Sequence, residues 1–152
     1  MTTRAARLVA SLFVLFILFA PVARADRRVE SFNRDWKFLR GNPAGAEAPG
    51  FDDRAWQAVR LPHDWAIAGP YDFRENPHTG KLPWRGDGWY RKHFTLPATD
   101  SGKRVVLDFD GVMAMPVVFV NGKRAGGWDY GYMGFRVDAT ELVEFGKDNV
   151  VA

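Results

Sequence analysis

The chain has 152 residues, enough for one domain and a short appendage, and carries 21 basic and 18 acidic residues for a net charge of +3. Residues 1–25 contain three arginines and no acid, so the remainder is balanced and offers no basic stretch for binding a nucleic acid. The absence of cysteine excludes disulfides and thiolate metal sites, so the fold must rely on its apolar core.

Residues 1–25 have the three parts of a secretory signal peptide. Arg4 and Arg7 precede an apolar run of 13 residues, 8–20, and Ala23-Arg24-Ala25 follows as a small-residue cleavage site. The run is shorter than the ~20 residues that a membrane-spanning helix needs, so no stable membrane anchor is expected. The sequence therefore predicts export, to the periplasm or the medium, of a mature domain at residues 26–152.

The first half of the mature part predicts few regular elements. Residues 29–39 read as a strand, residues 40–50 as a Gly- and Pro-rich surface loop, and residues 52–56 as one helical turn with acids at its start. Residues 63–87 form a long irregular segment rich in Trp, Tyr and Arg. Such long loops in compact domains are usually functional or disordered.

Strand signals are denser in the second half. Residues 89–96 read as a strand, and in 104–109 Val105, Leu107 and Phe109 alternate with outward positions. Residues 117–120 are apolar on both faces, which predicts a central strand, and Asn121-Gly122 predicts a two-residue hairpin turn. Further elements are a return strand, a strand, a short turn and a final strand, at 124–128, 135–138, 140–143 and 149–152.

No helical period persists in the mature part, whereas short strands recur about every ten residues with turn signals between them. The pattern predicts an all-β domain, a β-sandwich or jelly roll. We expect five aromatic residues in its core: Trp36, Trp56, Trp89, Tyr90 and Trp128. The three histidines lack metal-ligand spacing, so we expect no zinc site and no cofactor.

Ordered sequence blocks carry a family resemblance. They are Phe32–Phe38, Phe51-Asp52-Asp53, Leu61–Trp65 with Gly69–Asp72, Gly88–Phe94, Phe109–Val112, Val118–Gly122 and Phe135–Asp138. Together they resemble the N-terminal sugar-binding domain of family 2 glycoside hydrolases, in the β-galactosidase branch most closely. The resemblance implies a galactose-binding-like jelly-roll β-sandwich, followed by an immunoglobulin-like domain and a (β/α)8 barrel with two catalytic glutamates. We therefore expect residues 26–152 to be a C-terminally truncated form of this domain.

Retaining glycoside hydrolysis requires two carboxyl groups ~5–5.5 Å apart, one a nucleophile and one an acid/base. The chain has five glutamates, which read as turn and surface residues, and we assign no catalytic residue to it. The resemblance places the loop after Pro62 near the mouth of the barrel, so Asp64, Trp84 and Arg85 are predicted to line the edge of the substrate pocket. The alternative is that Asp64 caps a turn and Trp65 fills the core.

Three hypotheses about function remain open from the sequence. The first is the N-terminal piece of an exported glycosidase that binds a β-galactoside or related glycan and braces the barrel domain of the same protein. The second is a free-standing carbohydrate-binding module, which would need an exposed aromatic platform. The third is a truncated product without a function of its own, whose cut strand would expose an unpaired sheet edge.

Overall fold

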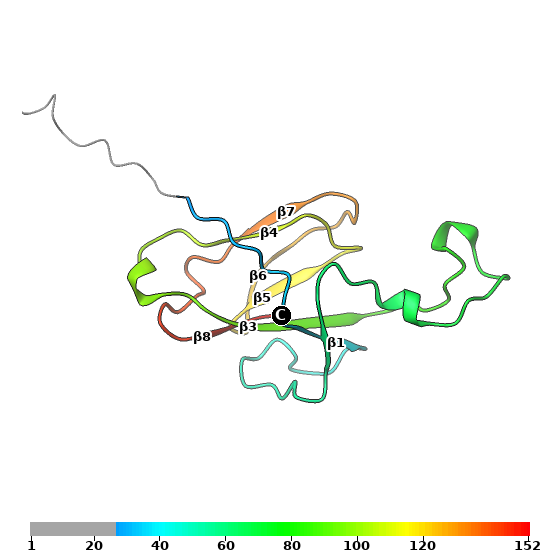
Figure 1. Cartoon of the computed structure of the whole chain (residues 1–152), viewed down its shortest axis with the longest axis horizontal. Helices are drawn as coiled ribbons and strands as arrows, with labels where there is room; N and C mark the ends of the chain where they lie inside the picture. Colours follow the sequence, from blue (N-terminus) through cyan, green and yellow to red (C-terminus); the bar gives the residue numbers. More distant parts are fainter. Residues whose placement is uncertain (1–26) are drawn as a thin grey trace, which may run out of the picture. The chain divides into compact units, whose positions relative to one another are not determined.

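The computed structural model describes residues 27–152, so the predicted signal peptide lies outside the described residues. The chain divides after Ser31, and the compact unit Phe32–Ala152 contains all the regular elements of the described part (Figure 1). These are β1 (Trp36–Arg40), β2 (Gln57–Val59), η1 (Trp65–Ala68), η2 (Pro77–Thr79), β3 (Gly88–Thr95), η3 (Ala98–Asp100), β4 (Val106–Phe109), β5 (Val117–Val120), β6 (Lys123–Gly127), β7 (Phe135–Asp138) and β8 (Asp148–Val151), where η marks a short 3-10 helix.

The strands form two antiparallel sheets. Six of them are ordered β2-β1-β3-β8-β5-β6, and β4 pairs with β7 in a second, two-stranded sheet. The all-β prediction is therefore confirmed. Within residues 27–152 no helix is long and apolar enough to cross a membrane.

The core joins the two sheets. Inward-facing residues of β4 and β7 pack in one buried cluster with residues of β1, β5 and β8: Trp36, Leu107, Val118, Val120, Phe135, Val137, Ala139 and Val151. Leu107 is buried whereas Val106 is 40% exposed, which confirms the alternation predicted for this strand. β5 has a neighbour on each side, as its doubly apolar sequence predicts, although the edge strand β6 lies directly beside it.

Several long loops gather at one end of the larger sheet. Arg40 at the end of β1 lies opposite Gly88 at the start of β3, and Val117 at the start of β5 lies opposite Gly127 at the end of β6. β3 and β5 are both antiparallel to β8, so their starts share one end of the sheet. That end carries the loops 64–87, 110–116 and 128–134, on the right of Figure 1.

Some predicted elements differ in the structure. The strand expected at 29–39 begins only at Trp36, and residues 52–56 form a turn rather than a helical turn. Trp56 is buried as predicted, but Trp128 is 45% exposed, so its assignment to the core was wrong. The reason is that β6 ends at Gly127, which leaves Trp128 in the loop beyond the sheet with its amide bonded to the Pro116 carbonyl.

The turn between β5 and β6 has the predicted form, with positive φ at Asn121 (50°) and Gly122 (79°). The Asn121 side chain also has a role that its sequence context did not reveal. Its amide donates to the Leu142 carbonyl and to Asn149 Oδ1, each at 2.8 Å, and its oxygen accepts from the Val150 amide at 2.8 Å. The hairpin is thereby fastened to β8 and to the turn before it.

Replacing Asn121 tests this fastening. We expect Asn121→Gly, which keeps the positive φ but removes three part-buried hydrogen bonds, to lower the free energy of unfolding by about 2 kcal/mol. Asn121→Ala should lose about 1 kcal/mol more because alanine resists the left-handed conformation. Urea unfolding checks both, with the exposed neighbour substitution Lys123→Ala as control. Equal stability of Asn121→Gly and the control would contradict the role of the side chain.

Candidate functional site

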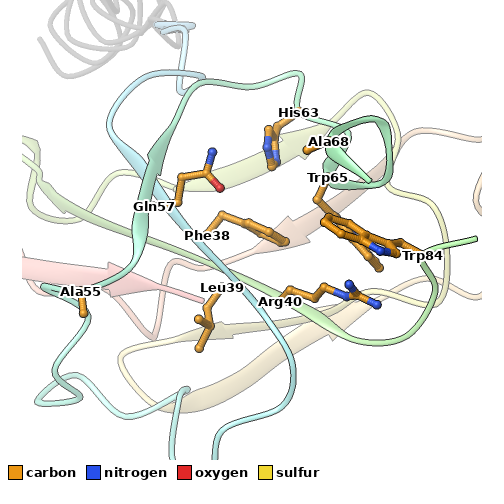
Figure 2. A pocket seen from close by; sticks show the side chains of 9 residues that line it. All are labelled: Phe38, Leu39, Arg40, Ala55, Gln57, His63, Trp65, Ala68 and Trp84. Atoms are coloured by element: carbon orange, nitrogen blue, oxygen red, sulfur yellow. The ribbon is translucent and has the colours of Figure 1, made fainter. Parts of the chain in front are cut away.

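A groove opens at the loop-rich end of the sheet, where β1 and β2 meet the segment that follows Leu61. Its volume is about 360 Å³, and Figure 2 shows the side chains that line it. Nine residues line it: Phe38, Leu39, Arg40, Ala55, Gln57, His63, Trp65, Ala68 and Trp84. None of the nine carries a carboxylate. The volume lies at the low end of the ~300–1,000 Å³ that small-molecule sites occupy, so the groove could accept a ligand of about one sugar unit.

The groove is built around a stack of aromatic rings and one cation. The guanidinium carbon of Arg40 lies over the Trp84 ring at 4.5 Å and over the Trp65 ring at 5.1 Å. Trp65 in turn stacks on Phe38, with ring centroids 6.2 Å apart and planes inclined by 23°. Cation–π contacts of this kind contribute ~0.5–1 kcal/mol each at exposed sites, so Arg40 ties the loop to the end of β1.

Two local features hold the tryptophans in place. Asp64 caps η1, because its Oδ1 accepts a hydrogen bond from the Ala66 amide at 2.9 Å, and this directs Trp65 into the groove. Gly69 packs directly on the Trp84 indole: a Cβ at this position would lie 2.6 Å from the nearest ring carbon. The loop can therefore cover Trp84 only because residue 69 has no side chain.

His63 lines the groove and lies beside Tyr90 of β3. His63 Nδ1 lies 2.9 Å from the Tyr90 hydroxyl. Burial, and then the charge of Asp64, raise the pKa of Tyr90 to about 12, so the phenol stays protonated throughout the physiological range.

The structure separates the three predicted pocket residues. Trp84 lines the groove, whereas Asp64 and Arg85 do not: Asp64 acts as the turn cap of the alternative interpretation, and Arg85 is exposed and pairs with Glu75 at 2.9 Å. Contact of any of the three with a substrate stays a prediction. Sequence reasoning missed Arg40 and Gln57, because a polar residue at a strand end gives no signal of what the fold brings beside it.

The segment 69–86 is an arm held by its own polar contacts. Lys81 Nζ donates to the carbonyls of Phe73 and Glu75 at 2.9 and 3.0 Å, and Asp72 forms a two-pronged pair with Arg74. The arm nevertheless exposes large apolar groups, with Tyr71 61% and Phe73 80% accessible. The arm is thus an ordered loop with an exposed apolar surface.

A second exposed apolar surface lies at the same end of the sheet. It is formed by the loops 110–116 and 128–134, which pack together where Gly131 faces Met113 and Ala114. The exposed side chains are Met113, Met115, Trp128, Tyr130, Tyr132 and Met133, each at least 45% accessible. Contiguous surfaces of this composition are typical of interaction sites.

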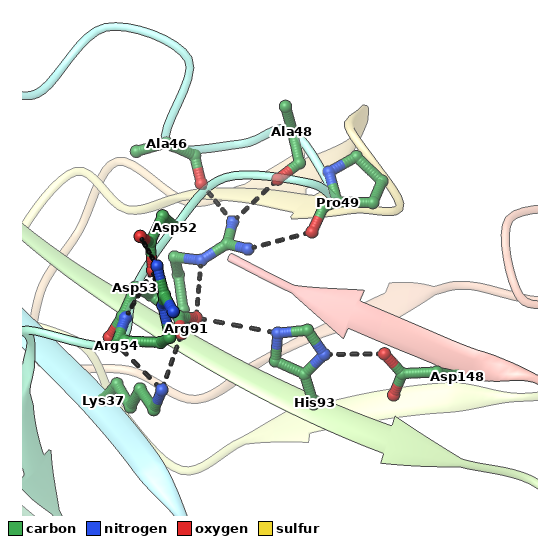
Figure 3. A network of polar contacts seen from close by, with 10 residues as sticks. All are labelled: Lys37, Ala46, Ala48, Pro49, Asp52, Asp53, Arg54, Arg91, His93 and Asp148. Carbon is green, nitrogen blue, oxygen red and sulfur yellow. Dashed lines mark hydrogen bonds and ion pairs between the residues drawn. The ribbon is translucent and has the colours of Figure 1, made fainter.

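A charged cluster joins β1, β3 and β8 to the loop 43–54 (Figure 3). Arg91 on β3 is fully buried, and its Nε donates to Asp53 Oδ2 at 3.0 Å. Its remaining nitrogens donate to three backbone carbonyls, those of Ala46, Ala48 and Pro49. Arg91 therefore binds the loop 43–54 to the sheet. In the described part of the chain, every buried side-chain nitrogen or oxygen atom has a hydrogen-bond partner.

Asp53 is the centre of the cluster. Lys37 Nζ lies 2.6 Å from its Oδ1, and His93 bridges it to Asp148, with nitrogen–oxygen distances of 3.6 and 2.7 Å. Burial alone would raise the pKa of Asp53, but the hydrogen bonds from Lys37 and Arg91 outweigh it and lower the pKa below its usual 3.8. Among residues 27–152 no group of three His, Asp or Glu side chains could hold a metal, and we read the cluster as structural.

Residues 61–152 match the family model described as the glycosyl hydrolase 2 galactose-binding domain-like family. Similar curated proteins include the β-galactosidase BoGH2A of Bacteroides ovatus, 42% identical over 89% of this chain, and a β-glucuronidase of Formosa agariphila, 35% identical over 86%. The chain spans only 15% and 14% of the lengths of these two relatives.

Solved structures agree with the same assignment. A glycosyl hydrolase family 2 member from Bacteroides cellulosilyticus superposes with a TM-score of 0.71 and 37% identity, covering 80% of this chain and 16% of that one. A β-glucuronidase from Bacteroides uniformis superposes with a TM-score of 0.73 and 31% identity, covering 83% of this chain and 14% of that one.

The contact between Gly69 and Trp84 gives a test of the groove. We expect Gly69→Ala to displace the indole, which should lower stability by about 1–3 kcal/mol and shift the Trp84 indole N–H resonance. Gly50→Ala is the matched control, because a Cβ there meets nothing within 4 Å and its φ is not positive. If the spectra and melting temperatures of the two variants agree, the packing of residue 69 on Trp84 does not shape the groove.

Asp53 provides a test of the charged cluster. Asp53→Asn should cost about 3 kcal/mol near neutral pH, because it leaves the buried Arg91 without its carboxylate. The folded pKa of Asp53 is lowered, so its contribution is present above the unfolded pKa of ~3.9 and is lost as pH falls through the lower folded value. Wild type should therefore lose more stability than Asp53→Asn between pH 5 and pH 2.

Chemical denaturation at a series of pH values checks this expectation. The control is Asp52→Asn, which removes the carboxylate of an exposed pair with Arg54 and should change stability little. Parallel pH profiles for wild type and Asp53→Asn would show that Asp53 does not anchor the cluster through its charge.

Proposed function

The chain belongs to the glycosyl hydrolase family 2 galactose-binding-like domains, and from this premise we propose that it serves as the N-terminal domain of a longer, exported enzyme that hydrolyses terminal β-glycosidic bonds. The observation that carries the proposal is the family match over residues 61–152, together with relatives of which the chain spans about a seventh. We assign the catalytic glutamates to a barrel domain of that longer protein.

Within that enzyme, the loop-rich end of the sheet is the part that we propose to meet the barrel. The groove, the arm 69–86 and the exposed surface of loops 110–116 and 128–134 all lie at this end, which supports a shared role in docking and in walling the substrate pocket. Trp84 would contribute its indole to the pocket edge. Asp64 would contribute by capping η1 ahead of the arm, and Arg85 through its pair with Glu75 within the arm.

The substrate is proposed to be a β-galactoside or a β-glucuronide. The relative at 42% identity is named a β-galactosidase, which favours the first, and several relatives at 30–35% are named β-glucuronidases. The sandwich itself is proposed to be a jelly roll, supported by its two antiparallel sheets and by the family match.

A direct test compares two proteins. We expect the product of the full reading frame that contains this sequence to cleave 4-nitrophenyl β-D-galactoside or β-D-glucuronide with retention of configuration, and the 152-residue chain to cleave neither. In the full product, Trp84→Ala should raise KM more than it lowers kcat, because the residue would bind substrate without reacting. Turnover by the 152-residue chain after rigorous removal of contaminating enzymes would refute the assignment of catalysis to another domain.

A free-standing carbohydrate-binding module is the second candidate. It is favoured by the exposed rings of Trp128, Tyr130 and Tyr132, since exposed aromatic platforms bind sugars by stacking. Saturable binding of neutral galactosides by the chain, lost in Tyr132→Ala and Trp128→Ala, would support this candidate. A reading frame that continues into a barrel domain would instead support the enzyme.

A further inference from the structure

Arg40 stands apart from the other arginines near the groove. Arg54, Arg74 and Arg85 each pair with a carboxylate close by in the sequence. The guanidinium of Arg40 lies against two indoles instead, and within residues 27–152 its side chain forms no hydrogen bond or ion pair. Its five N–H donors are therefore available to a partner from outside the described chain.

The setting of Arg40 favours an anion with a planar pair of oxygens. A guanidinium has a fixed fork that matches a carboxylate with two parallel hydrogen bonds, and aromatic contacts hold the fork in place before binding. The contacts with Trp65 and Trp84 thus reduce the conformational freedom that a free arginine would lose on binding. None of the nine residues that line the groove is acidic.

The remaining lining groups suit a sugar ring that carries this carboxylate. Gln57 lies on the wall opposite Arg40 in Figure 2, and its amide makes no hydrogen bond within residues 27–152. An amide offers one acceptor and two donors, which suit sugar hydroxyls. Arg40 and Gln57 thus supply hydrogen-bonding groups beside the indoles of Trp65 and Trp84.

We propose that this groove binds the carboxylate of a uronic acid unit, with Arg40 as the fork that receives the carboxylate and Gln57 as a partner of the ring hydroxyls. The inference rests on the proposed function, because it takes the ligand from among glycans. It extends that function by naming a recognition site for acidic sugars on the non-catalytic domain. The site would select an acidic unit of the glycan independently of the residues that cleave it.

In the test, the 152-residue chain is titrated with methyl β-D-glucuronide and, separately, with methyl β-D-glucoside, which lacks the carboxylate. Binding is followed by NMR through the indole resonances of Trp65 and Trp84. We expect the glucuronide to bind at least ten times more tightly than the glucoside, and its affinity to fall as salt is raised. Equal affinities for the two glycosides, or displacement of the glucuronide by an equal concentration of acetate, would overturn the proposal.

Variants of Arg40 test whether this residue causes the preference for the glucuronide. Arg40→Gln should remove the preference for the glucuronide, and Arg40→Lys, which keeps the charge but not the fork, should retain only part of it. Arg60→Gln is the matched control, because Arg60 is exposed and unpaired within residues 27–152 but does not line the groove. Melting temperatures show which variants are folded. If Arg40→Gln unfolds, the comparison of Arg40→Lys with wild type decides, and an unchanged preference in a folded Arg40 variant overturns the proposal.

Failure of this inference is separable from failure of the proposed function. If the full reading-frame product cleaves glycosides but the 152-residue chain does not bind the glucuronide, only the proposal of a uronate site is refuted. If the chain binds the glucuronide through Arg40 but the full product has no glycosidase activity, the proposed enzymatic function is refuted and the uronate site is supported.

Discussion

The fold depends on the burial of one cation. Arg91 sits at full burial in β3, where an unpaired charge would be strongly unfavourable, so its surroundings must supply acceptors on every side. Asp53 and three carbonyls of the preceding loop meet this demand. The loop 43–54 is therefore not a free connection between β1 and β2. The loop surrounds the Arg91 guanidinium, and its fixed position also holds β1 and β2, the two strands that line the groove.

The groove contains a second arginine, Arg40, whose surroundings differ from those of Arg91. Arg40, at the end of the strand beside β3, is flanked by two indole rings, and the described part of the chain supplies it with no carboxylate. Arg91 is satisfied from within and so stabilises the domain. Arg40 is held in place but left open to the outside, and so it is suited to recognition. The two arginines illustrate how the same side chain serves structure or binding according to what the fold places opposite it.

Features that depend on residues close together in the sequence could be predicted, whereas features that depend on residues far apart in the sequence could not. Local signals were sufficient for the Asn121-Gly122 hairpin, the alternation around Leu107 and the all-β class, because these depend on neighbouring residues. Trp128 was misassigned because its exposure depends on where β6 ends, and Arg40 was missed because Trp84 lies 44 residues further along the chain. Of the predicted pocket residues, only Trp84 lines the groove, since the loop turns Arg85 toward Glu75.

The arm 69–86 has a consequence for how this domain diversifies. Its ion pairs, its lysine-to-carbonyl bonds and the contact of Gly69 with Trp84 close within the arm, and Trp84 meets the sheet at Arg40. Substitutions at its tip therefore leave the strand register untouched. If the arm borders the substrate pocket as proposed, its tip can be altered to suit a different glycan without disturbing the sheet beneath it, so specificity and stability would depend on separate parts of the chain.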